Sequence, residues 1–174
     1  YYDFAHGPAP EVEKGEVDEN GRNHYERLRM NLAEGGEYVQ DASAFLDPVT
    51  GLLTAHAYHA DRSMRESGFD VSGRFGFANL DVLEILPVCL NTLLWRLEVD
   101  IAKVREFLDA TSTLDVWQER IRQRTASITE RFWDEEAGLF SDYDARAGRR
   151  RLYPFATTFW PMWAGLASRE QAAR

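Results

Sequence analysis

The clearest pattern in this chain is a helical spacing of apolar residues in its second half. Between residues 79 and 109, apolar side chains recur three and four positions apart, and they include Leu90, Leu93, Leu94, Leu97, Ile101, Val104 and Leu108. That spacing places them on one face of an α-helix. Pro87 predicts a break or a first turn in this stretch, because proline cannot donate a hydrogen bond inside a helix.

A second long helix is predicted over residues 113–133. Its apolar stripe consists of Leu114, Trp117, Ile121, Ile128 and Phe132. Hydroxyl groups of the preceding residues 111–113 are available for an N-cap. Residues 133–155 mix aromatic residues with Asp, Gly and Arg, which indicates a loop or a short hairpin. Residues 156–166 then predict a third, aromatic helix, and Ser168 and Gln171 have the spacing of a capping box.

The first part of the chain is richer in loops. Residues 23–34 predict a short helix with Asn23 as its N-cap, and residues 47–51 carry the Asp, Pro and Gly of a tight turn. Residues 52–63 fit more than one element. Because no segment has the pattern of a parallel strand, the chain predicts an all-α fold of packed helical hairpins with a loop-rich N-terminal segment.

Composition and charge narrow the possible partners. A length of 174 residues suits one domain, and a net charge of −9 disfavours binding to a phosphate backbone. No apolar run approaches the roughly 20 residues of a membrane helix, so we expect neither a nucleic acid nor a membrane as partner. Cys89 is the single cysteine, which excludes an intrachain disulfide and leaves the compartment open between the cytoplasm and an exported location. We expect it to be an inert thiol in the middle of an apolar helix.

Several other groups of residues have a functional and a structural interpretation. His56 and His59 have the spacing of two metal ligands but lack a clear third, so no metal site is predicted. The acidic residues between 134 and 144 do not match a calcium loop and favour a hairpin with solvated charges and a cap or two. The arginines at 146–151 are interpreted as partners of those acids. Trp160 and Trp163 favour a core position over a carbohydrate platform.

The segment most suited to chemistry is residues 64–76. It places Glu66 and Asp70, two arginines and the ring of Phe69 in one short stretch, with glycines that permit close approach of a ligand. Carboxylates beside an aromatic ring suit glycoside chemistry, because an apolar neighbour favours the protonated form of an acid that must donate to a leaving oxygen. A surface turn with mutually paired charges is the alternative.

This segment resembles the signature of the trehalases, family 37 of the glycoside hydrolases. Residues 66–72 with Arg74 are similar to the family pattern E-S-G-[WF]-D-x-S-x-R. Residues 87–95, 133–144 and 153–167 are similar, in the same order, to three further family segments. The resemblance implies an α/α-barrel, inversion of configuration in the hydrolysis of α,α-trehalose to glucose, and Asp70 as the general acid.

The same resemblance implies the other site residues. Gly68, Phe69 and Arg74 are expected to bind substrate, and Glu11 would do so if residues 8–11 correspond to the family's R-P-E motif. No cofactor is implied. Three positions depart from the pattern: Ala9 stands where an arginine is usual, Cys89 where an aspartate is usual, and Phe69 where tryptophan is commoner. These departures leave strict trehalose specificity open.

The resemblance also implies that residues 1–174 are one incomplete catalytic domain. The general base of the family follows the part that this chain resembles, and the visible helices are too few to close a barrel. We therefore expect the rest of the catalytic domain to be a partner of this chain, with a disaccharide as substrate. Two alternatives remain: a related α/α-barrel glucosidase acting on another α-linked glucoside, and an inactive helical fragment or sugar-binding module.

Overall fold

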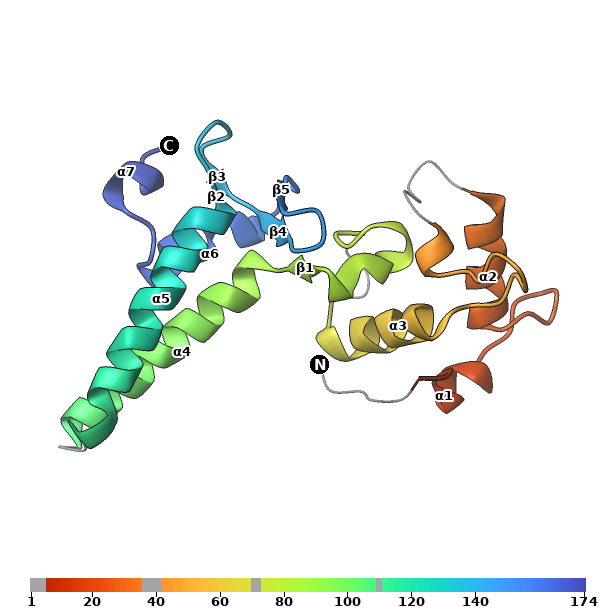
Figure 1. The fold of residues 1–174 in the computed structure, drawn as a ribbon, viewed down its shortest axis with the longest axis horizontal. Helices are drawn as coiled ribbons and strands as arrows, with labels where there is room; N and C mark the ends of the chain where they lie inside the picture. The colour runs from red at the N-terminus through yellow and green to blue at the C-terminus, as the bar shows by residue number, and fades with distance from the viewer. Residues whose placement is uncertain (1–5, 36–41, 70–72, 109–110) are drawn as a thin grey trace. The chain divides into compact units, whose positions relative to one another are not determined.

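The computed structural model of the chain describes residues 6–35, 42–69, 73–108 and 111–174. It forms two compact units, Tyr1–Leu83 and Glu84–Arg174. Figure 1 traces both units along the chain. Helices dominate each unit, in agreement with the predicted all-α class.

The first unit is built around two helices. Its elements are α1 (Pro10–Glu13), α2 (His24–Glu34), the 3-10 helix η1 (Ala42–Ala44), α3 (Ala55–Ser67) and the 3-10 helix η2 (Phe77–Leu83). The helix predicted over residues 23–34 is confirmed as α2, and Asn23 and Glu26 form a capping box at its start. Its buried face carries Tyr25, Leu28 and Leu32.

Of the ambiguous residues 52–63, those from Ala55 onward belong to α3, whereas Leu53 pairs with Leu46 in an isolated β-bridge. The predicted tight turn precedes this helix, and Asp47 Oδ1 accepts hydrogen bonds from the backbone N–H groups of Val49 and Thr50. The N-cap residue of the helix is Thr54, whose side chain accepts from the N–H of Ala57. It ends at Gly68 in the left-handed region, at φ 74°, as a glycine C-cap does. Capping at both ends selected a helix where the apolar pattern alone was undecided.

The second unit is a helical hairpin with small antiparallel sheets at one end. Its helices are α4 (Val88–Phe107), η3 (Thr111–Thr113), α5 (Leu114–Phe132), η4 (Ala156–Phe159), α6 (Trp160–Ala164) and α7 (Arg169–Ala172). Helices α4 and α5 pack along each other, as Figure 1 shows. Arg124 Nε and Nη2 each lie 2.9 Å from the Glu98 carboxylate, and Trp95 Nε1 donates to Thr125 Oγ1 at 2.8 Å. These bonds join the two helices.

Pro87 marks the start of α4, because it is the N-cap residue of that helix. The predicted break is confirmed. Residues 79–86, which the apolar spacing had included in the helix, instead form the end of η2, a turn at Glu84 and the short strand β1 (Ile85–Leu86). Cys89 is buried, but it lies in the first turn of α4 and not in its middle.

The hairpin predicted over residues 133–155 is present as two pairs of strands. Strand β2 (Trp133–Asp134) pairs with β3 (Leu139–Phe140). Strand β4 (Asp142–Asp144) pairs with β1 on one side and with β5 (Arg149–Arg151) on the other, all antiparallel. The sheets hold the segment after α5 against the start of α4.

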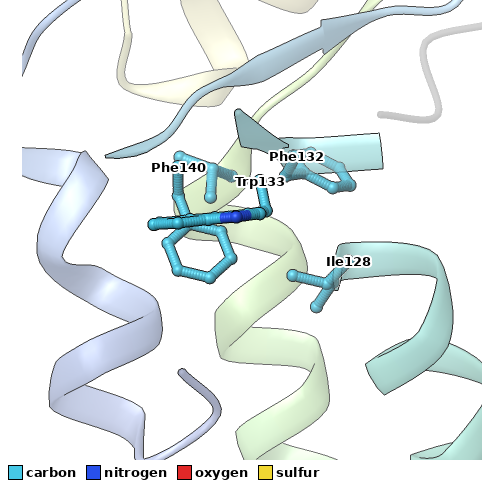
Figure 2. Close-up of a cluster of buried hydrophobic side chains, with 5 residues drawn as sticks. Ile128, Phe132, Trp133 and Phe140 are labelled. Atoms are coloured by element: carbon cyan, nitrogen blue, oxygen red, sulfur yellow. The ribbon is translucent and has the colours of Figure 1, made fainter. Parts of the chain in front are cut away.

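The core of the second unit lies where the hairpin meets these strands. It consists of Val88, Ile128, Phe132, Trp133 and Phe140. Figure 2 labels four of these side chains, with the Trp133 indole beside the Phe140 ring; the centroids of these two rings are 4.9 Å apart. Burial of large aromatic side chains is the main source of stability here.

Two predicted features of this unit are wrong in detail. Thr113 is the N-cap residue of α5 but makes no side-chain capping bond, so its hydroxyl does not do what the sequence predicted. Trp163 contacts Trp160 edge-on, with ring centroids 5.7 Å apart, yet it is 70% exposed and is not a core residue.

The apolar stripe of α4 is largely exposed. Leu93 and Leu97, one turn apart, are 41% and 55% exposed, and Val104 is 55% exposed. Helix α5 covers the opposite, more polar side of α4 through the Glu98–Arg124 pair. The helical periodicity was therefore correct, but the described residues do not cover the face that it predicts to be buried.

We predict that Asp142 stabilises α4 from outside the helix. Its Oδ1 accepts the N–H of Val88 at 2.9 Å, in a buried position at the positive end of the helix dipole. Asp142→Ala should lower the free energy of unfolding of the second unit by about 1–3 kcal/mol, because a buried N–H loses its acceptor. Asp142→Asn should cost less, since Oδ1 remains.

Urea unfolding followed by tryptophan fluorescence measures this, because all five tryptophans lie after residue 94. Asp144→Ala is the matched control: its Oδ1 accepts the N–H of Ala147 in an exposed turn. Equal losses for the Asp142 and Asp144 variants would contradict the prediction.

Candidate functional site

A buried carboxylate organises the first unit beside the predicted signature segment. Asp61, on α3, is only 7% exposed. Its Oδ1 lies 2.8 Å from His24 Nε2, and its Oδ2 accepts from the Tyr25 hydroxyl at 3.2 Å and from Arg65 Nε at 2.9 Å. A buried charge is tolerated only when it is paired in this way. We name these four residues the Asp61 cluster.

Opposing effects set the pKa values in the Asp61 cluster. Burial raises the pKa of Asp61, but hydrogen bonds and positive charge from His24 and Arg65 outweigh it and hold the pKa below its ordinary value. For Tyr25, burial is the largest cause, and together with the negative charge of Asp61 it raises the pKa to about 12. At neutral pH, Asp61 is therefore ionised and Tyr25 carries its proton.

The Asp61 cluster also reaches the N-terminal segment of the chain. The backbone N–H of Ala9 donates to the Tyr25 hydroxyl at 2.9 Å, and Ala9 is 1% exposed as the N-cap residue of α1. Glu11 lies in the first turn of α1 with its side chain exposed. Burial lowers the pKa of Arg65, whereas the bond to Asp61 and the negative charges of Asp61 and Glu11 raise it above its usual value. The predicted substrate-binding Glu11 therefore lies within electrostatic reach of α3.

The other predicted binding residues meet at the end of α3. The Phe69 and Phe75 rings are 5.3 Å apart, and the Arg74 guanidinium carbon lies 5.4 Å from the centroid of each ring. Phe75 is fully buried and Arg74 is 2% exposed. The structure thus brings Phe69 and Arg74 together directly after Gly68, as cation–π partners.

The backbone that follows this aromatic cluster is strained. Ala78 and Asn79 adopt left-handed conformations at φ 48° and 58°, which cost a non-glycine residue on the order of 1–2 kcal/mol each. Asn79 is buried, and its Oδ1 accepts the N–H of Phe75 at 3.3 Å. Packing of Phe75 and this hydrogen bond hold a conformation that local preference disfavours.

Asp70, the predicted general acid, lies outside the described residues. The structure therefore shows the two ends of its segment, Phe69 and Gly73, and not its side chain. The role of Asp70 as the general acid therefore stays a prediction.

Sequence reasoning missed the Asp61 cluster. His24 and Tyr25 lie 37 and 36 residues from Asp61, and nothing in the local pattern of either segment pairs them. One signal was available: Asp61 and Arg65 are four residues apart on a helix, which is the spacing of an ion pair.

The other candidate groups have structural roles. His56 stacks on Phe45 with ring centroids 5.5 Å apart, and no group of three or more potential metal ligands occurs within the described ranges. Asp134 accepts the N–H of Ala137 in a turn, as a solvated hairpin carboxylate was expected to do. Asp142 differs from that expectation, because it is buried. In the part of the chain that the structure describes, no helix combines the length and apolarity needed to cross a membrane.

Comparisons with known proteins give the same family as the one that the signature segment resembles. The family model described as Trehalase matches residues 14–174. A probable trehalase of Eremothecium gossypii is 34% identical over 99% of this chain, and a cytosolic neutral trehalase of Saccharomyces cerevisiae is 39% identical over 66% of it. The solved structure of neutral trehalase Nth1 from Saccharomyces cerevisiae matches 68% of this chain with a TM-score of 0.59 and 38% sequence identity.

The helical fold and these matches assign the chain to the α/α-barrel class of folds, of which it forms a part. The chain belongs to the trehalase family. It spans 23% of the length of the Eremothecium relative and of the solved structure, and 16% of the Saccharomyces cerevisiae cytosolic neutral trehalase.

We predict that the Asp61 cluster makes the first unit sensitive to acid. Because the folded pKa of Asp61 lies below its ordinary value of 3.8, the unfolded state binds its proton first as the pH falls. The stabilisation is present above pH 3.8 and is lost as the pH falls further, through the folded pKa. Asp61→Asn should be less stable at pH 6 and should show a smaller loss of stability between pH 5 and pH 2.

Urea unfolding followed by circular dichroism at each pH measures this effect. Tryptophan fluorescence of the same samples is an internal control, because it reports the second unit, where the variant should match the parent chain. Identical acid-dependent losses in Asp61→Asn and the parent chain would refute the role of Asp61.

Proposed function

We propose that the protein containing this chain hydrolyses α,α-trehalose to glucose with inversion of configuration, and that Asp70 is its general acid. Membership of the trehalase family supports the activity, and the names of the relatives support the substrate. The single observation that supports the site is the packing around its segment. Gly68 ends α3 and the Phe69–Arg74–Phe75 cluster follows, so both ends of the Asp70 segment belong to fixed structure.

The described residues suggest how the acid is supported. The ring of Phe69 directly precedes Asp70, and an apolar neighbour favours the protonated acid that must donate to the glycosidic oxygen. Arg74 is buried against the two phenylalanine rings, so we assign it to holding the segment in place. Glu11 is exposed and available to accept hydrogen bonds from sugar hydroxyl groups.

An inverting hydrolase requires a second carboxylate to activate water. The two carboxyl groups are usually about 6.5–9.5 Å apart, on opposite faces of the sugar. The resemblance assigns this base to the part of the relatives that the chain does not match, and the chain spans less than a quarter of their length. In this proposal the 174 residues supply the acid and part of the binding surface.

One observation favours hydrolysis of another α-linked glucoside as the second candidate. Ala9 is 1% exposed and its methyl group cannot donate a hydrogen bond, so the sugar contact that the resemblance places at this position is not made by its side chain. A site that loses one polar contact discriminates less strongly between related sugars. A panel of α-linked glucosides distinguishes the two candidates.

The acid role of Asp70 leads to a prediction for the full-length protein. Asp70→Asn keeps the shape of the side chain but removes the transferable proton, so turnover of trehalose should fall by about 10²–10⁴ while the protein stays folded. α-Glucosyl fluoride has a leaving group that needs little protonation, and its turnover should fall much less. Both rates are measured by glucose release.

Glu66→Gln is the matched control, because it makes the same change four residues earlier on the exposed side of α3. It should leave both rates within about twofold of the parent protein, an effect too small to represent loss of a catalytic group. An equal loss for both substrates in a folded Asp70→Asn variant would show that Asp70 is not the general acid.

We further propose that the rest of the catalytic domain covers the exposed face of α4. The stripe at Leu93, Leu97 and Val104 is apolar and continuous along one side of the helix. Monomeric proteins rarely expose such a stripe, and helical-hairpin folds bury it against neighbouring hairpins. The relatives provide the length for those hairpins, because this chain spans 23% of them.

The 174-residue chain on its own should therefore self-associate. Leu97→Gln should shift it toward the monomer, because the substitution places a polar group in the middle of the stripe. Leu52→Gln is the matched control, since Leu52 is exposed to a similar extent, 58% against 55%, but lies in the first unit. Sedimentation velocity over a concentration series measures the association, and the same distribution for both variants would contradict the proposal.

A further inference from the structure

The Tyr25 hydroxyl lies between two segments that are distant in the sequence. It donates to Asp61 Oδ2 at 3.2 Å and accepts from the backbone N–H of Ala9 at 2.9 Å. The three residues are buried, with exposed fractions of 6% for Tyr25, 7% for Asp61 and 1% for Ala9. One hydroxyl group therefore connects α1 to α3 through the interior of the first unit.

The Asp61 carboxylate fixes the orientation of that hydroxyl. Because an ionised carboxylate can only accept, the Tyr25 proton must point toward Asp61 and its oxygen lone pairs face Ala9. Asp61 is itself held by His24 and Arg65. Hydrogen bonds to ionised groups are stronger than neutral ones, so the bond to Asp61 holds the Tyr25 hydroxyl in place. The oxygen that accepts from the N–H of Ala9 therefore has a defined position.

Helix α1 is a short, exposed element that this contact helps to hold in place. It has four residues, none of them buried, and its N-cap residue receives no side-chain capping bond. Among the described residues, a second and longer hydrogen bond runs from Asn23 Nδ2 to the carbonyl oxygen of Glu13 at 3.3 Å, and the charge of Glu13 also acts on Tyr58 of α3. A helix this short is not stable alone, so its contacts determine where Glu11 lies.

We propose that Tyr25 and Asp61 are positioning residues for sugar binding, which act by holding Glu11 next to the end of α3. Glu11 would accept from hydroxyl groups of the substrate, while Tyr25 and Asp61 themselves do not touch it. The effect of Glu11 on the pKa of Arg65 supports the proximity. The sugar-binding part of this inference rests on the proposed function, whereas the tethering of α1 does not.

The test compares two tyrosines of the same aromatic pair. Tyr25 and Tyr58 pack edge-on with ring centroids 5.0 Å apart. Tyr25→Phe removes the hydroxyl that hydrogen-bonds α1 to Asp61. Tyr58→Phe removes a hydroxyl on α3 that the negative charge of Glu13 influences but for which no hydrogen bond to α1 is seen among the described residues. In the full-length protein, Tyr25→Phe should raise KM for trehalose about three- to tenfold with kcat unchanged, the worth of one hydrogen bond used for binding. Tyr58→Phe should leave both values within twofold.

A double-mutant cycle separates positioning from general stability. If Tyr25 acts through Glu11, Glu11→Gln raises KM and adding Tyr25→Phe raises it little further. Independent, multiplying effects of the two substitutions would overturn the proposal. So would a Tyr25→Phe protein that lowers kcat and the melting temperature while leaving KM unchanged. Asp61→Asn is the second variant, and it should raise KM in the same direction.

Hydrogen exchange tests the contact between α1 and Tyr25 independently of the proposed function. The amide of Ala9 should exchange faster in Tyr25→Phe than in Tyr58→Phe or the parent protein, whatever the substrate is. Unchanged exchange at Ala9 would overturn the inference even if the enzyme hydrolyses trehalose. If exchange accelerates but the parent protein does not hydrolyse trehalose, the proposed function fails. The same KM comparison, made with the α-glucoside that it does hydrolyse, then decides the binding role.

Discussion

The first unit depends on one buried negative charge. A carboxylate in the position of Asp61 loses most of its hydration, and this loss is tolerable only because three donors converge on it. Those donors come from two helices. One donor, the Tyr25 hydroxyl, also accepts a hydrogen bond from the backbone N–H of Ala9. Arg65, which forms an ion pair with Asp61, lies one turn before Gly68, where α3 ends within the signature segment. The helix that carries Asp61 therefore also leads into the segment of the candidate site.

The second unit is organised differently, by apolar packing and by helix ends. Its core forms where Trp133 and Phe140 close over the hairpin, and a carboxylate 54 residues away in sequence satisfies the first N–H of α4. The two helices of the hairpin are joined by the Glu98–Arg124 ion pair, which is a polar contact. The described residues leave the side of α4 that carries the leucines exposed. The relatives are several times longer than this chain, and helical-hairpin folds bury such a face against neighbouring hairpins.

The elements with strong local signals were the ones that the sequence predicted well. Asn23 and Glu26 specify the start of α2 because both halves of a capping box lie within four residues, and Ser168 and Gln171 do the same for α7. Pro87 marks the start of α4 because its missing N–H is a local property. Thr113 shows the limit of this reasoning, since a residue with the right side chain at the right place makes no capping bond.

By itself the sequence determined the family, the helical class and the residues that are candidates for catalysis, because each depends on residue types at short, fixed spacings. Only the tertiary structure showed that Arg74 is buried between two phenylalanines, that Asp142 is buried at a helix end, and that α4 leaves its apolar stripe uncovered. It also revealed the Asp61 cluster. The physical reason is that burial and hydrogen bonding depend on which distant segments meet. A side chain does not encode by itself whether its charge will be solvated, as at Glu66, or enclosed by donors from another helix, as at Asp61.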